Sequence, residues 1–182
     1  SSMEEIFKQL KIGHLLPKFP IIQGGMGVGI SLSGLAGAVA AAGGIGVIST
    51  AGIGLLAKRE PITIEMEDEM LKQEIRNARK ISDGILGVNI MVALTNFASL
   101  VKSSIEEKID VIFSGAGLPL DLPKYLTPDS KTMLVPIISS ARALSIIWQK
   151  WLRSFNYLPD AVVVEGPLAG GHLGFKYEQL ED

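Results

Sequence analysis

The sequence predicts an α/β protein built around a parallel sheet. Short runs rich in Ile and Val alternate along the chain with longer amphipathic segments, and glycines stand at many of the boundaries. The short runs are apolar throughout instead of alternating with polar residues, which is typical of parallel strands covered on both faces. Strands and helices in this order favour either a doubly wound open sheet or a (β/α)8 barrel.

The first predicted strand covers residues 20–23 and is followed by a helix. Ser31 or Ser33 can cap that helix, and its apolar residues fall at helical spacing: Leu32, Leu35, Ala36, Val39 and Ala40. The second strand is expected at residues 45–49. Residues 51–65 then form a long connection, and long loops are often functional.

A second, more regular helix is predicted over residues 66–80. Its apolar residues form one face, which consists of Met66, Met70, Leu71, Ile75 and Ala78. Acidic residues at 67–69 and basic residues near the other end match the helix dipole. Gly84 follows closely and is the expected C-cap.

The remaining elements repeat the same order of strand and helix. Thr95 is expected to cap a helix, and residues 115–131 contain enough Pro and Gly to allow only one short helix. Ser139 or Ser140 is expected to cap a last helix with a strong apolar stripe: Leu144, Ile147, Trp148, Trp151, Leu152 and Phe155. The strands are expected at residues 85–90, 110–113, 133–137 and 161–164. Residues 1–182 thus form a single domain with six β/α repeats or slightly fewer.

Charge and composition exclude several classes of protein. With 17 basic and 19 acidic residues, the net charge of -2 provides no attraction toward nucleic acid or anionic membranes. Cysteine is absent and histidine occurs twice, so we expect no disulfide, iron–sulfur or metal site. The uncharged stretch between Lys18 and Lys58 is long enough for a membrane span, but its glycines and strand-length apolar runs fit a buried strand–helix–strand unit. Without an export signal, the expected location is the cytoplasm.

Ligands of parallel α/β proteins bind at the carboxyl ends of the strands, and two sequence features fall there. After the first strand, four of the six residues 24–29 are glycine, so backbone N–H groups can approach a flat or anionic ligand. A merely flexible turn explains this run equally well. Asn89 interrupts an apolar strand, and its amide can donate and accept hydrogen bonds at once, although a buried structural Asn is an equal alternative.

Two later loops at the same end also carry candidate residues. Ser114 and Gly115 begin a small, permissive segment after the fourth strand. After the sixth strand, glycines surround His172, and histidine is the side chain whose ordinary pKa lies nearest neutrality. The other histidine, His14, precedes the first strand at the opposite end of the sheet, and we interpret it as structural.

Four motifs in register connect the chain to a known family. They are Phe-Pro-Ile-Ile-Gln-Gly-Gly-Met-Gly at 19–27, Ala-Gly-Gly-Ile-Gly at 42–46, Gly-Val-Asn-Ile at 87–90 and Ala-Gly-Gly-His-Leu-Gly at 169–174. In order and spacing the chain resembles the nitronate monooxygenase family, also called 2-nitropropane dioxygenase-like. That group includes flavin-dependent enoyl-acyl-carrier-protein reductases. The sequence departs from the commoner Gly-Pro-Met pattern at residues 24–26, and residues 114–117 replace a segment that contains Phe in many monooxygenases.

The resemblance implies a TIM barrel that binds FMN and acts as an oxidoreductase on a small molecule. His172 matches the catalytic histidine, and Ser114 and Gly115 would lie in the substrate pocket. The residues implied to bind FMN are Gly24, Gly25, Met26, Gly27, Asn89, Glu165, Gly170 and Gly171. The favoured reaction is oxidation of alkyl nitronates with O2; the alternative is reduction of an enoyl thioester with NAD(P)H. A non-catalytic β/α ligand-binding protein is the second alternative.

The resemblance also changes how the length is interpreted. A TIM barrel needs about 200 residues or more, and its phosphate site usually follows strands seven and eight. We therefore expect the chain to cover about the first six β/α units of a (β/α)8 barrel. Further residues, or another chain such as the partner in a homodimer, would provide the missing strands and the grip on the FMN phosphate.

Overall fold

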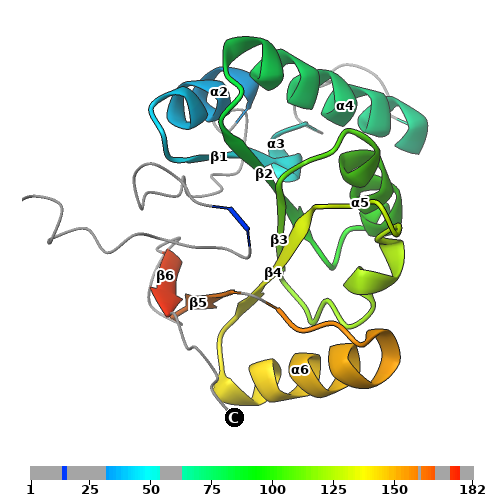
Figure 1. The fold of residues 1–182 in the computed structure, drawn as a ribbon. Coiled ribbons are helices and arrows are strands. Elements are labelled where there is room, and N and C mark those ends of the chain that lie inside the picture. Colours follow the sequence, from blue (N-terminus) through cyan, green and yellow to red (C-terminus); the bar gives the residue numbers. More distant parts are fainter. Residues whose placement is uncertain (1–13, 16–31, 54–62, 160, 167–172, 177–182) are drawn as a thin grey trace, which may run out of the picture.

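The computed structural model describes residues 14–15, 32–53, 63–159, 161–166 and 173–176 (Figure 1). The strand predicted at residues 20–23 lies outside this part of the chain. So do the glycine-rich run at 24–29 and the loop residues 167–172. Everything below concerns the described residues.

The described strands form one sheet in which spatial order follows chain order. The strands are β1 (Ile45–Ser49), β2 (Ile85–Met91), β3 (Val111–Gly115), β4 (Met133–Ile138), β5 (Val162–Glu165) and β6 (Leu173–Lys176). Neighbours from β1 to β5 are parallel. A doubly wound sheet would reverse its strand order at a switch point, whereas a barrel adds each strand beside the previous one. The order therefore fits part of a barrel and not an open doubly wound sheet.

The last strand was not predicted from the sequence. β6 pairs antiparallel with β5, with Glu165 opposite Leu173 and Val163 opposite Phe175. The sequence predicted a loop in this region, because a pattern of four residues is too short to distinguish a strand from a loop. The pairing covers the free backbone edge of β5, which otherwise exposes unpaired N–H and C=O groups.

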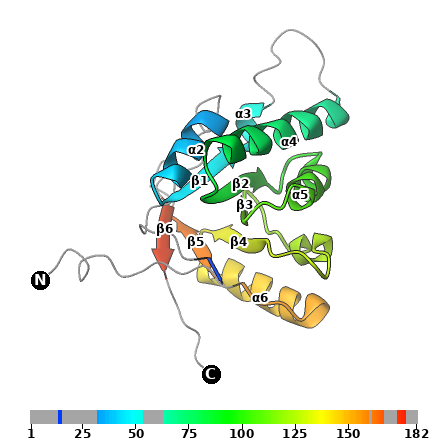
Figure 2. The ribbon, with the colours of Figure 1, turned by 45° about the horizontal axis from the view of Figure 1, so that its top comes forward.

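The helices in the described part of the chain all pack on one face of the sheet (Figure 2). They are α2 (Ser33–Ala41), α3 (Thr50–Ile53), α4 (Ile64–Ile81), α5 (Phe97–Glu106), the short 3-10 helix η1 (Leu122–Tyr125) and α6 (Ala141–Phe155). The single short helix between β3 and β4 agrees with the prediction from the Pro and Gly content of that segment.

Two apolar cores lie on the two faces of the sheet. The outer core joins the strands to the helices and includes Ile48, Val88 and Ile112. The inner core lies on the opposite face and consists of Leu15, Ile45, Val47, Val111, Phe113, Val135 and Val163. Because successive side chains of a strand point to opposite faces, each strand from β1 to β5 contributes to both cores. Burial on both faces explains why the strands read as unbroken apolar runs in the sequence.

Several helix ends differ from the sequence prediction. Ser33 does not cap α2, since Leu32 holds the cap position and the backbone N–H of Ser33 donates to the Glu74 carboxylate of α4 at 2.8 Å. Thr95 does not cap α5, which begins after Asn96 without a side-chain cap. Ser140 does cap α6, where its hydroxyl accepts the N–H of Ala143 at 3.1 Å. At the start of α2, a carboxylate of the neighbouring helix α4 thus takes the place of a local cap.

The helix predicted over residues 66–80 is α4, which runs from Ile64 to Ile81. Leu71, Ile75 and Ala78 are buried as expected, but Met66 is 45% exposed. Thr63 caps the helix by accepting the N–H of Met66 at 3.2 Å. Met66 lies in the first turn, so the end of the helix projects beyond the sheet and leaves the side chain in solvent.

Two glycines allow α2 to lie close to the sheet. A Cβ atom at Gly46 would come within 1.9 Å of the carbonyl oxygen of Ala36, and one at Gly84 within 2.3 Å of that of Ala40. Gly84 is not the C-cap of α4, because Ser82 holds that position. Its lack of a side chain serves helix packing instead.

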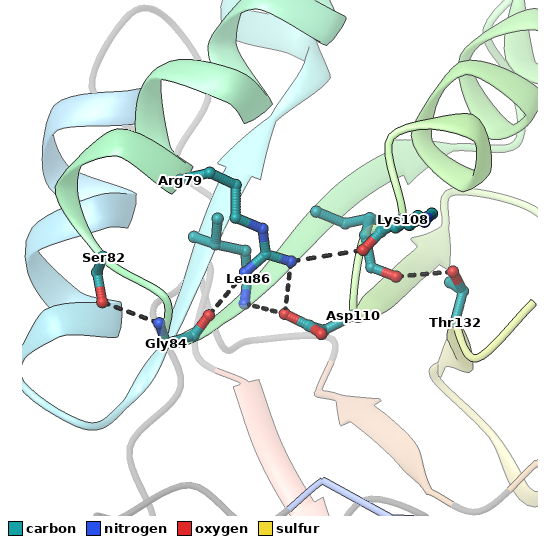
Figure 3. Close-up of polar contacts among 8 residues, drawn as sticks. Arg79, Ser82, Gly84, Leu86, Lys108, Asp110 and Thr132 are labelled. Atoms are coloured by element: carbon teal, nitrogen blue, oxygen red, sulfur yellow. Dashed lines mark hydrogen bonds and ion pairs between the residues drawn. The ribbon is translucent and has the colours of Figure 1, made fainter.

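A polar network joins the amino ends of β2, β3 and β4 (Figure 3). Asp110, just before β3, accepts the backbone N–H of Leu86 at 2.9 Å and the guanidinium of Arg79 at 2.8 Å. The same guanidinium donates to the carbonyl of Gly84 at 2.8 Å. Thr132 donates to the carbonyl of Ile109 at 2.7 Å. The polar groups named here therefore bond one another or the backbone, and these hydrogen bonds stabilise the amino end of the sheet.

Candidate functional site

The carboxyl ends of β1 to β5 meet at one edge of the sheet, where ligands of such folds bind. On the inner face of that edge, Ser49 and Phe113 lie alongside Asn89 in the β1–β2 and β2–β3 registers. One layer further along, Met91 lies beside Gly115. The structure thus brings Asn89 and Gly115, both predicted from sequence, onto the same face of the same edge.

Asn89 is a polar residue near the carboxyl end of β2, a strand that is otherwise apolar. Its side chain is half-buried, and its amide makes no hydrogen bond to any described residue. By contrast, Asn77 accepts a hydrogen bond from Gln73, and Asn96 donates one to Glu67. A half-buried amide without a protein partner has unmet capacity to donate and to accept. It suits a planar ring that carries both N–H and C=O groups.

Gly115 ends β3 and begins a tight turn. Its carbonyl accepts the N–H of Val92 at 2.8 Å, and the next two residues have positive φ values, 54° at Ala116 and 134° at Gly117. A Cβ atom at Gly115 would come within 2.7 Å of the Cβ of Ile137. A side chain at residue 115 would clash with β4, so packing requires glycine there. The glycine therefore adds no side chain to the inner face at this position.

Ser114 lies on the other face of the sheet. It alternates with Gly115 along β3 and therefore points toward the helices with Ile112. The side chain is fully buried, and its hydroxyl donates to the carbonyl of Ile90 at 2.9 Å. The two residues that the sequence grouped as pocket candidates thus have different surroundings.

Glu165 is the last residue of β5 and lies at the carboxyl end of that strand. Its side chain is exposed and forms no ion pair with a described residue. Gly166 and Leu173 flank the segment that carries His172, and Leu173 pairs with Glu165. His172 itself lies outside the described residues, as do Gly24, Gly25, Met26, Gly27, Gly170 and Gly171.

Sequence reasoning missed one residue at this edge. Thr50, the first residue of α3, is 6% exposed, and its hydroxyl donates to the carbonyl of Asn89 at 2.9 Å. The available signal was a hydroxyl residue directly after an apolar strand, at the predicted ligand end. That signal is weak, because such residues also serve as ordinary helix caps.

Two features are absent from the described part of the chain. No group of three His, Cys, Asp or Glu side chains there is placed to hold a metal ion. None of the described helices has the length and apolar character needed to cross a membrane.

Comparisons with known proteins agree with this geometry. The family model described as nitronate monooxygenase matches residues 8–103 and 95–182. The structure is similar to that of an M276A mutant of FabK from Thermotoga maritima, with a TM-score of 0.67 and 32% identity over 87% of this chain and 46% of that one. It is also similar to nitroalkane oxidase from Streptomyces ansochromogenes, with a TM-score of 0.62 and 16% identity over 92% of this chain and 49% of that one. The comparison with curated proteins gave no match.

These findings confirm the predicted fold and family. The chain spans about half the length of the solved structures that it resembles, which agrees with a partial TIM barrel. The family and these neighbours are flavin-dependent oxidoreductases. A family model that matches nearly the whole sequence, with a parallel sheet in barrel order, shows that the chain belongs to the nitronate monooxygenase family.

Proposed function

We propose that the chain forms part of an FMN-dependent oxidoreductase whose flavin lies at the carboxyl ends of β1 to β5. The observation that carries this proposal is the half-buried amide of Asn89, which has no partner among the described residues and lies at the edge where such folds bind ligands. Flavin dependence of the family supports the choice of cofactor.

The residues present fit a flavin. The Asn89 amide would donate to a carbonyl and accept from an N–H of the isoalloxazine ring. The backbone of Gly24, Gly25, Met26 and Gly27 would lie against the ring, and Glu165, Gly170 and Gly171 would complete the contacts. Bound FMN would provide a carrier for electrons taken one or two at a time.

Reduction of an enoyl thioester is the reaction that similarity supports best. The chain is 32% identical to FabK, an enoyl-acyl-carrier-protein reductase, across 87% of its length. In this reaction NAD(P)H is the electron donor, and His172 would orient the substrate or hold the proton that it receives. The pocket would then accept an acyl chain near Gly115.

Oxidation of alkyl nitronates, which the sequence motifs placed first, is the second candidate. The description of the matching family model supports it. Here O2 is the co-substrate, and His172 would take the proton α to the nitro group or orient the nitronate. The likeness to nitroalkane oxidase, at 16% identity, speaks only for the fold.

A visible absorption spectrum of the purified full-length protein tests the proposal. We expect a flavin spectrum, either as purified or after addition of FMN. Anaerobic NADH should then bleach the flavin, and crotonyl thioester should restore it. O2 uptake that depends on nitronate, without this response, would support the second candidate. A colourless protein that takes up no FMN would reject both and favour a non-catalytic ligand-binding protein.

A further inference from the structure

The carboxyl end of β2 is fastened from both sides by buried hydroxyl groups. Thr50 donates to the carbonyl of Asn89 at 2.9 Å, and Ser114 donates to the carbonyl of Ile90 at 2.9 Å. Thr50 is 6% exposed and Ser114 is fully buried. One hydroxyl comes from the start of α3 and the other from β3, so the two bonds grip consecutive peptide units of the same strand.

Strand geometry explains why two different neighbours are needed. Consecutive carbonyls of a strand point to opposite sides, so Asn89 faces β1 with its carbonyl and Ile90 faces β3. Strand β1 ends at Ser49, and the hydroxyl of Thr50 extends the pairing by one more bond. Beyond them, the N–H of Val92 donates to the carbonyl of Gly115 at 2.8 Å.

These bonds set the direction of the Asn89 side chain. They hold the peptide planes that follow Asn89, and those planes determine where its Cα–Cβ bond points. The backbone therefore fixes the point and the direction from which the Asn89 side chain leaves β2. A side chain that starts from a fixed direction has fewer conformations to lose when its ligand binds.

We propose that Thr50 and Ser114 are positioning residues that aim the Asn89 amide at the flavin. This inference rests on the proposed FMN site. Under this proposal, Ser114 acts on the flavin site through the backbone of β2 and does not contact the substrate. It also predicts that the two hydroxyls affect cofactor binding only through Asn89.

The chain contains matched control residues for the test. Thr132 is 4% exposed and donates to the carbonyl of Ile109 at 2.7 Å, but at the amino end of the sheet. Ser104 is fully buried and donates to the carbonyl of Leu100 at 2.8 Å within α5. Thr132→Val and Ser104→Ala therefore remove the same kind of bond as Thr50→Val and Ser114→Ala, away from the flavin edge.

FMN affinity of the full-length apoprotein, measured by quenching of flavin fluorescence, is the main readout. We expect Thr50→Val and Ser114→Ala to weaken binding about 3- to 10-fold, no more than the loss expected from removal of the Asn89 amide itself. Thr50→Ser should restore affinity to within about twofold, and both control variants should stay within the same limit. In an Asn89→Ala background, Thr50→Val should cause no further loss, because coupled residues are not additive.

A second readout needs no flavin. The side-chain NH2 signals of Asn89 in a ¹H–¹⁵N spectrum of the apoprotein should shift in Thr50→Val and remain in place in Thr132→Val. Equal FMN affinity and unchanged Asn89 signals in Thr50→Val would overturn the positioning role while leaving the FMN site intact. Additive losses in the Asn89→Ala background would show a general structural effect instead. A wild-type protein that takes up no FMN would reject the proposed function itself.

Discussion

The two ends of the sheet treat their polar groups in opposite ways. At the amino end, Asp110 accepts from Leu86 and Arg79, and Thr132 ties the loop before β3 to β4 (Figure 3). At the carboxyl end, the amide of Asn89 and the carboxylate of Glu165 have no partner among the described residues. The polar side chains described at the amino end bond one another, whereas these two at the carboxyl end bond no other described residue, although Thr50 and Ser114 hold the backbone of β2 there.

This difference matches the division of labour in barrel folds. Residues at the amino ends of the strands generally stabilise the fold, and residues at the carboxyl ends carry the chemistry. Variants at the amino end should therefore change the free energy of unfolding, and variants at the carboxyl end should change binding or rate.

The largest effect is expected from His172→Ala. If His172 moves or holds a proton in the reaction, the turnover rate should fall by roughly 10²–10⁴ while the content of bound FMN stays the same. His14→Ala is the control, because His14 is exposed and lies outside the four family motifs. Steady-state kinetics with enoyl thioester and with nitronate measure the change. An unaltered rate with both substrates would remove His172 from the mechanism.

At the amino end, Asp110→Ala should lower the free energy of unfolding by about 2 kcal/mol, because it leaves the N–H of Leu86 and the Arg79 guanidinium without their acceptor. Asp110→Asn keeps an acceptor oxygen and should lose less. Chemical denaturation gives both values. FMN affinity should match wild type in both variants, and a clear loss there would contradict the separation of the two ends.

At the carboxyl end, Asn89→Ala should show the reverse pattern. FMN binding should weaken about tenfold, which corresponds to about 1.4 kcal/mol, since the amide is proposed to bond the ring. The free energy of unfolding should change little, because the side chain has no described partner to lose. Asn77→Ala, which removes the bond to Gln73 on α4, should leave FMN affinity unchanged. Titration of apoprotein with FMN compares the two variants.

The smallest effect concerns Asp129 in the loop before β4. A hydrogen bond from the Thr127 hydroxyl, at 2.6 Å, and one from its own backbone N–H lower the pKa of this carboxyl below its ordinary value of 3.8. A carboxyl group whose pKa is lowered in the folded protein stabilises the fold at pH values above its ordinary pKa. This contribution disappears as the pH falls through the pKa of the folded state. Thr127→Val should therefore raise the pKa of Asp129, visible by ¹³C NMR titration. The stability of the two proteins should converge in strong acid; an unchanged pKa would assign the shift to the backbone.

Much of the fold follows from local pattern. The apolar runs at residues 45–49, 85–90, 110–113, 133–137 and 161–164 predict β1 to β5 with ends that differ by no more than two residues. Strands that are buried on both faces need apolar residues throughout, so these runs predict the strands directly. Asn89 also stands out in the sequence, because a polar residue interrupts an otherwise apolar strand near its carboxyl end.

Other features depend on which elements meet in space. The N-terminus of α2 is satisfied by Glu74, forty-one residues away, and not by a local serine. The antiparallel pairing of β6 depends on the free edge of β5. No local pattern records these contacts, because each partner is chosen by packing at long sequence separation.

The sequence by itself determined strands β1 to β5, their parallel α/β class, the family motifs and the candidate residue Asn89, since these depend on periodicity and residue type. Only the tertiary structure decided that Ser114 faces the helices while Gly115 faces the inner core, and that Thr50 holds the carbonyl of Asn89. Successive residues of a strand point to opposite faces of the sheet, but only packing against other elements decides which of them faces the helices. That choice leaves Gly115 on the same face as Asn89 and places Ser114 where it bonds the backbone of β2.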